Sequence, residues 1–154
     1  MRKPIAAANW KMNGDFALVE AFAKHAWPQG NVEKIFGLPA IYISKAHELG
    51  LEILAGEDVS AHASGAHTGE ISAAMLKEAG ANYAIIGHSE RRTDHGETET
   101  LLIEKWKQLK AQEIKVIYCI GESLQEYDAG QCDAAVLRQM KPVLEAGLVD
   151  ADTV

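Results

Sequence analysis

The chain has 154 residues, of which 47% are hydrophobic and 24% charged, a composition typical of one globular domain with a sizeable core. Fifteen basic against 22 acidic side chains give a net charge of −7, which argues against a nucleic-acid partner because such a partner favours a basic face. No apolar run approaches the ~20 residues of a membrane span, so no membrane contact is expected. Cys119 and Cys132 have no CxxC spacing and no histidines grouped around them, so we expect a cytoplasmic protein with free thiols and without metal or other cofactor.

The first third of the chain alternates apolar runs with stretches of helical spacing. A strand is predicted at 5–10, and Asp15 can cap the helix that follows it. That helix has apolar residues at helical spacing: Phe16, Val19, Ala23 and Trp27. A second strand is predicted near 33–38, a short helix around 44–49 and a third strand at 51–55.

The rest of the chain continues the same alternation. Residues 57–70 are rich in Gly, Ser and His and predict a protruding loop, since long loops in compact domains usually have a function. A helix at 72–78 ends at Gly80, and a fourth strand follows at 82–86. A longer helix has the apolar stripe Leu102, Trp106 and Leu109. After a fifth strand at 115–120, a last helical region interrupted by Pro142 contains Val136, Leu137, Met140 and Leu144.

A strand followed by a helix, repeated five times, predicts an α/β fold in which helices cover a parallel sheet. The chain has no low-complexity segment and no stretch of linker composition. We therefore expect a single domain over residues 1–154.

Two polar segments stand at the ends of predicted strands. The hexapeptide Gly-His-Ser-Glu-Arg-Arg at 87–92 places His88 at the start of a helix, whose unpaired N–H groups favour a neutral imidazole that donates a hydrogen bond. Asn9 and Lys11 share one face of the first strand, and Trp10 points the other way into the core. Because parallel βα proteins build their sites at the carboxyl ends of strands, the three polar residues predict one site.

These two segments closely resemble those of the triosephosphate isomerase family, an enzyme family of glycolysis and gluconeogenesis. The resemblance implies conversion of dihydroxyacetone phosphate to glyceraldehyde 3-phosphate through an enediolate, a developing oxyanion that preorganised donors stabilise. Lys11 and His88 would be the catalytic residues, and Asn9 with Lys11 would bind the phosphorylated triose. Ser89 at the start of the helix and Glu90 would support them, Glu90 by pairing with the lysine.

The segment Thr68–Leu76 resembles the family's third loop and helix. In the family this loop inserts into a neighbouring subunit, which implies a homo-oligomer with His67, Thr68, Gly69 and Glu70 at the interface. Residues 119–122, Cys-Ile-Gly-Glu, resemble the end of the family's fifth strand. The family usually has Gln where Glu57 stands and an aromatic residue where His67 stands.

The family fold has eight βα units, and these residues supply five. We therefore expect a truncated, partial (βα)5 of a TIM barrel whose open sheet edges invite completion by oligomerisation. The segment 133–154 is expected to move most readily. The family's catalytic glutamate, closing lid and phosphate loops have no match here, so the interpretation is a homologue with little or no isomerase activity. The alternatives are an active isomerase with a partner-supplied base, one half of a split enzyme, and a plain binder of phosphate ligands.

Overall fold

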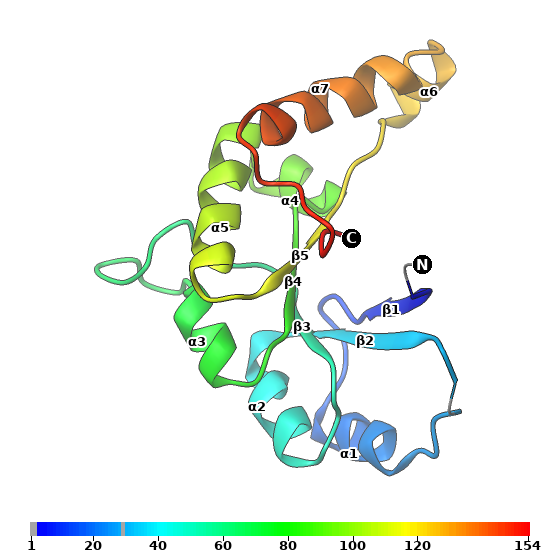
Figure 1. The fold of residues 1–154 in the computed structure, drawn as a ribbon, viewed down its shortest axis with the longest axis vertical. Coiled ribbons are helices and arrows are strands. Elements are labelled where there is room, and N and C mark those ends of the chain that lie inside the picture. The colour runs from blue at the N-terminus through cyan, green and yellow to red at the C-terminus, as the bar shows by residue number, and fades with distance from the viewer. Residues whose placement is uncertain (1–2, 29) are drawn as a thin grey trace.

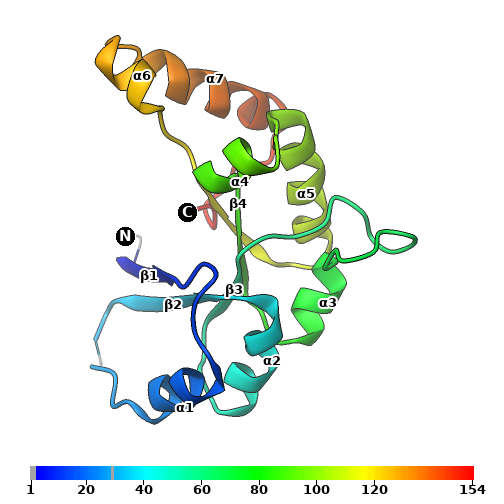
Figure 2. The ribbon, with the colours of Figure 1, turned by 180° about the vertical axis from the view of Figure 1, so that it is seen from behind.

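The strands of the protein form one parallel sheet in the order β1-β2-β3-β4-β5. The computed structural model describes residues 3–28 and 30–154. Over these residues the elements are β1 (Ile5–Asn9), α1 (Phe16–Lys24), β2 (Glu33–Leu38), α2 (Ala40–Glu48), β3 (Leu54–Gly56), α3 (Ala73–Glu78), β4 (Tyr83–Ile86), α4 (Ser89–Asp94), α5 (Glu99–Ala111), β5 (Lys115–Tyr118), α6 (Leu124–Asp128) and α7 (Cys132–Glu145). The sheet curls so that β1 and β2 run across the direction of β4 and β5, as part of a barrel wall (Figures 1 and 2). The predicted α/β class with a partial barrel is confirmed.

Alternate strand residues face two different environments. The main core lies between the sheet and the helices and includes Leu38, Leu54 and Ile86, each fully buried. A second cluster consists of strand residues only, Ile35, Ala55, Tyr83 and Ile85, and lies on the concave face of the sheet. β3, β4 and the second part of β2, residues 35–38, are buried on both faces, and their sequences there are continuously apolar.

The predicted strands are present, with shifts at their ends. β2 has the predicted bounds, β1 ends at Asn9 and β5 at Tyr118, whereas β3 begins only at Leu54. Asp15 caps α1 by accepting a hydrogen bond from the N–H of Leu18, as predicted. α1 ends before Trp27, and α2 begins directly after Pro39, whose fixed φ suits a helix start, so the prediction of 44–49 was too short.

The prediction for α5 is confirmed, because Leu102, Trp106 and Leu109 are all buried. Of the apolar residues predicted in α7, Val136 and Met140 are half-buried, and Met140 packs against the main core. Ala135, Gln139 and Val143 are the residues buried there, whereas Leu137 is 66% and Leu144 55% exposed. Pro142 lies within α7 and the helix continues past it, so it does not interrupt the helix as expected.

The end of the chain lies against the rest of the fold. α7 packs on α5. The N–H of Val154 donates to the carbonyl of Val116, and the N–H of Tyr118 donates to the carbonyl of Val154, each over 2.9 Å. Val154 thus begins to pair with the outer edge of β5, while β1 has a paired neighbour on one side only among the described strands.

Cys119 and Cys132 are free thiols. No helix in the described part of the chain has the length and apolar character to cross a membrane. Among the same residues, no group of three or more His, Cys, Asp or Glu side chains is arranged to hold a metal ion.

Candidate functional site

The polar residues predicted from sequence lie at the carboxyl edge of the sheet. Asn9 is the last residue of β1, and Lys11 follows two residues later. His88 stands two residues after β4, as the N-cap of α4. All strands are parallel, so these two strand ends lie at the same edge.

Lys11 is held in an unusual backbone conformation, with φ at 55°. Its N–H donates to Asn9 Oδ1 over 3.0 Å, which stabilises the tight turn out of β1. Its Nζ donates to Glu90 Oε1 over 2.8 Å, and the two side chains are 48% and 53% exposed. A non-glycine residue at positive φ is a strained conformation that often occurs at functional sites. The geometry therefore fixes where the ammonium group stands.

His88 accepts a hydrogen bond at Nδ1 from the backbone N–H of Glu90, over 3.3 Å. Glu90 Oε2 also lies 3.3 Å from Nδ1, and the two contacts require opposite protonation of that atom. The N–H contact caps α4 and leaves Nε2 as the nitrogen that carries a proton in the neutral ring. A neutral imidazole held this way can donate one hydrogen bond to an oxygen at the site.

Ser89 is the exposed first residue of α4. Trp10 points away from the site, as strand alternation predicts, and packs edge-on against Phe22 with ring centroids 5.1 Å apart. The structure therefore brings together Lys11, Asn9 and Glu90, with His88 capping the helix that begins at Ser89.

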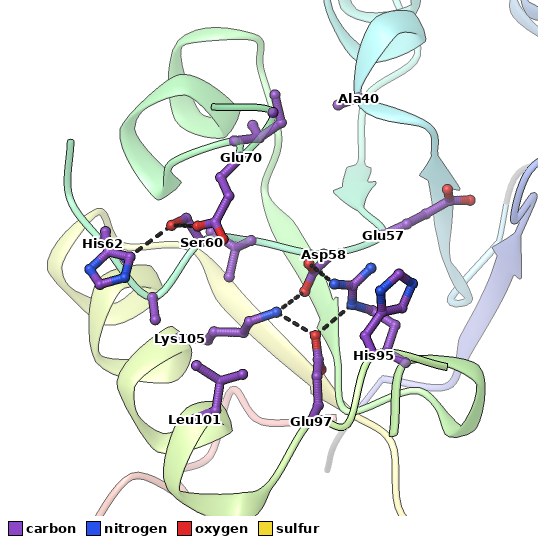
Figure 3. Close-up of a pocket in the computed structure, with 15 residues that line it drawn as sticks. Ala40, Glu57, Asp58, Ser60, His62, Glu70, His95, Glu97, Leu101 and Lys105 are labelled. Atoms are coloured by element: carbon purple, nitrogen blue, oxygen red, sulfur yellow. Dashed lines mark hydrogen bonds and ion pairs between the residues drawn. The ribbon is translucent and has the colours of Figure 1, made fainter. Parts of the chain in front are cut away.

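A charged cluster that the sequence analysis did not anticipate lies beside this site. Lys105 Nζ is 2.6 Å from Asp58 Oδ1 and 2.5 Å from Glu97 Oε1. Arg91 contacts Asp58 Oδ2 over 2.8 Å and Glu97 Oε1 over 2.6 Å. The cluster lines a cavity of about 550 Å³. Figure 3 shows Lys105, Asp58 and Glu97 converging there from α5, the loop after β3 and the loop before α5.

The pKa values of the two carboxylates in this cluster shift in opposite directions. Burial raises the pKa of Asp58, although Lys105 and Arg91 act against it. For Glu97, burial also acts to raise the pKa, but hydrogen bonds from Lys105 and Arg91 outweigh it and lower the pKa. One signal in the sequence could have revealed the cluster, because Lys105 lies three residues after Leu102 and four before Leu109, on the apolar stripe of α5. In the structure it is only 5% exposed.

Glu57 was not among the predicted site residues. Burial raises its pKa from 4.5 to about 7, a hydrogen bond from the Lys11 backbone acts against this, and the negative charge of Glu90 adds to it. Its Oε1 atom is buried and has no hydrogen-bond partner among the described residues.

The loop predicted at 57–70 projects between β3 and α3 (Figures 1 and 2). His67, Thr68, Gly69 and Glu70 are all exposed on it. The ring of His67 stacks on His62, with centroids 3.7 Å apart and planes 2° from parallel. At the base of the loop the Ser60 hydroxyl donates to Glu70, which lowers the pKa of that carboxyl, and the nearby histidines lower it further.

The curled parallel sheet, with polar side chains gathered at the carboxyl ends of its strands, defines part of a βα-barrel protein. A family model described as triosephosphate isomerase matches residues 4–153. The chain belongs to the triosephosphate isomerase family.

Individual relatives agree with this assignment. The chain is 58% identical over 154 residues to the triosephosphate isomerase of Dichelobacter nodosus, a match that covers 100% of this chain and 64% of the relative. It is 43% identical to that of Paracidovorax citrulli, with 93% and 61% covered. The crystal structure of the Bartonella henselae enzyme superposes with a TM-score of 0.89 at 33% identity, covering 99% of this chain and 66% of that one. The chain thus spans between 61% and 64% of the length of these two curated relatives.

Proposed function

We propose that these residues carry the electrophilic half of a triosephosphate isomerase site. Lys11 and His88 polarise the oxygens of dihydroxyacetone phosphate, and Asn9 with Lys11 binds this phosphorylated triose. Glu90 positions the ammonium group of Lys11, and Ser89 is the first residue of α4, the helix that His88 caps. The observation that carries the proposal is the 2.8 Å pair between Lys11 and Glu90 beside a histidine that caps α4. An ammonium and an imidazole N–H are donors suited to stabilise the oxyanion of an enediolate.

Formation of an enediolate also requires a base that removes a proton from carbon. Glu90 is paired with Lys11, and Glu57 is partly buried with a raised pKa, so neither is a free carboxylate at this edge. We propose that the base and the phosphate loops come from βα units other than these five. The 154 residues alone then have little or no isomerase activity, because loss of a general base typically removes ~10²–10⁴ in rate.

An isomerase assay on the purified chain tests this proposal. We expect turnover at least ~10²-fold below that of the full-length Dichelobacter nodosus relative measured in parallel. The variant His88→Gln is the control, since activity that survives it comes from contaminating host enzyme. Turnover close to that of the relative, and lost in His88→Gln, would refute the proposal.

A second candidate is an active assembly in which another chain supplies the base. It is supported by the two hydrogen bonds that Val154 makes with Val116 and Tyr118 at the outer edge of β5. We propose that the occupant is the C-terminal part of a relative, as in a split enzyme, or a second copy contacted through His67, Thr68, Gly69 and Glu70. A cytoplasmic setting fits the free thiols of this chain.

Mixing the chain with the C-terminal βα units of the Dichelobacter nodosus enzyme tests the split form. Activity in the mixture that neither piece has alone, and that is lost in His88→Gln, would support it.

Sedimentation at micromolar concentration tests self-association, for which we expect a dimer or larger. A monomer over the whole concentration range would refute it.

A further inference from the structure

Glu57 is a carboxylate at the carboxyl edge of the sheet to which the proposed reaction gives no role. It follows β3 directly and continues the strand face of Ile53 and Ala55, which belong to the concave apolar cluster. Asn9, the last residue of β1, and Lys11, two residues later, lie on the same side. Asp58, one residue later, turns instead to the charged cluster around Lys105, and Figure 3 shows the two carboxylates diverging.

The surroundings of Glu57 do not neutralise it. Its buried Oε1 has no hydrogen-bond partner in the described part of the chain, and the carboxyl faces the backbone N–H of Lys11. That N–H already donates to Asn9 Oδ1. The titratable and charged groups that act on Glu57 or line the same cavity are Lys11, Glu90, Asp58, His62, Glu70, Arg91, His95, Glu97 and Lys105. The lysines and arginine are the cations of this set.

Each cation among them is already engaged. Lys11 pairs with Glu90, while Arg91 and Lys105 both pair with Asp58 and Glu97. Ionised Glu57 would therefore add a second carboxylate next to Glu90 without a matching positive charge. Neutral Glu57 avoids that charge.

We propose that Glu57 is a positioning residue that works as a neutral carboxylic acid. While it is protonated, the Lys11 ammonium is balanced by Glu90 alone and can receive a phosphate monoester. Once it ionises, the group of Lys11, Glu90 and Glu57 carries a net negative charge and repels that anion. This inference rests on the proposed function, because it assumes that Lys11 receives a phosphorylated ligand. The raised pKa of Glu57 places the change near neutral pH.

Binding of glycerol 3-phosphate, a triose phosphate analogue without a carbonyl group, gives the first test. Affinity is measured by calorimetry from pH 5.5 to 8.5 for the wild type, Glu57→Gln and the control Glu52→Gln. Glu52 is an exposed glutamate near the opposite end of β3. Titration of the ligand phosphate near pH ~6 affects all three proteins equally. Between pH 6 and 8 we expect the wild type and the control to lose about tenfold more affinity than Glu57→Gln, which is one pKa unit of coupling.

The second test needs no ligand and therefore separates this inference from the proposed function. The side-chain ammonium signal of Lys11 is followed by NMR over the same pH range and assigned by its loss in Lys11→Met. We expect it to shift with the midpoint of the Glu57 carboxyl in the wild type, and to show no such step in Glu57→Gln. A purely structural role for Glu57 would not move the Lys11 signal with pH.

Three results would overturn the proposal: a Glu57 carboxyl that titrates near 4.5, a Lys11 signal with the same pH profile in Glu57→Gln, or equal pH dependence of binding in all variants. If no variant binds glycerol 3-phosphate at any pH, the proposed function fails. The NMR titrations then still decide whether Glu57 controls the charge around Lys11.

Discussion

Replacement of Glu57 by Gln should stabilise the protein at neutral and alkaline pH. In the native state burial and the charge of Glu90 raise the pKa of Glu57 from 4.5 to about 7, whereas the unfolded chain keeps the ordinary value. Between these two pH values the native state binds the proton and the unfolded state releases it. The free energy of unfolding therefore falls as pH rises from 4.5 to about 7, and the contribution of protonated Glu57 is fully present only below 4.5. Gln does not titrate and removes this slope.

The size of the effect follows from the two pKa values. A change from 4.5 to about 7 corresponds to a ceiling of roughly 3 kcal/mol, at about 1.36 kcal/mol for each tenfold change in proton affinity. Because Glu57 is only partly buried, solvent screening reduces this to about 1–2 kcal/mol.

Urea unfolding at pH 4.5 and at pH 8 measures the difference between Glu57→Gln and the wild type. We expect almost no difference at pH 4.5 and a gain of about 1–2 kcal/mol for the variant at pH 8. Glu52→Gln should show neither change. A variant that is less stable than the wild type at pH 8, or an equal difference at both pH values, would show that the carboxyl is not protonated in the native state.

Further substitutions test packing and buried charge by urea unfolding. Gly80→Ala should destabilise the protein by at least about 1 kcal/mol more than Gly50→Ala. Both glycines have positive φ, but a Cβ at Gly80 would lie 2.4 Å from the ring of His47 in α2, whereas a Cβ at Gly50 would have no atom within 4 Å. Leu109→Ala should cost about 2–5 kcal/mol because Leu109 is fully buried, whereas Leu137→Ala, at 66% exposure, should change stability by less than about 0.5 kcal/mol. Lys105→Met should cost about 3–5 kcal/mol because it removes the more deeply buried of the two cations that pair with Asp58 and Glu97 and leaves Arg91 alone to balance both carboxylates; wild-type stability of this variant would refute that interpretation of the cluster.

The helix α7 shows where sequence periodicity stops being informative. Its larger apolar residues, such as Leu137 and Leu144, predict one face, but the face that packs on α5 includes Gln139. Gln139 is buried because its side-chain amide makes two hydrogen bonds to the backbone of Gly121, over 2.8 and 2.9 Å. Such a pairing between segments 18 residues apart satisfies a polar group in the core, and no local pattern announces it.

The candidate site was more predictable than α7 for a physical reason. Strand alternation alone puts Asn9 and Lys11 on one face, and parallel pairing brings the end of β1 to the same sheet edge as His88. The same alternation, carried from Ile53 and Ala55 to Glu57, could have placed Glu57 on this face. Its burial and its missing partner depend on the packing of distant segments, so they could be found only in the structure.

The two sets of ion pairs near His88 do different work. The Lys11–Glu90 pair is half exposed, and such pairs are worth at most about 1 kcal/mol, so it orients the ammonium group rather than stabilising the fold. The contacts of Arg91 and Arg92 are more buried, and they link α4 to the loop after β3, the loop before α5 and the ends of β4 and β5. Arg91 binds Asp58 and Glu97, while Arg92 donates to the carbonyl oxygens of Gly87 and Cys119.

Since His88 is the N-cap of α4, the position of its imidazole depends on how firmly this short helix is held. Six residues of helix have little intrinsic stability, so the fixed placement of the donor must come from tertiary contacts. The contacts of Arg91 and Arg92 therefore hold α4, and with it His88, in place. The buried charges that appear costly for folding are the contacts that position the histidine for its proposed role.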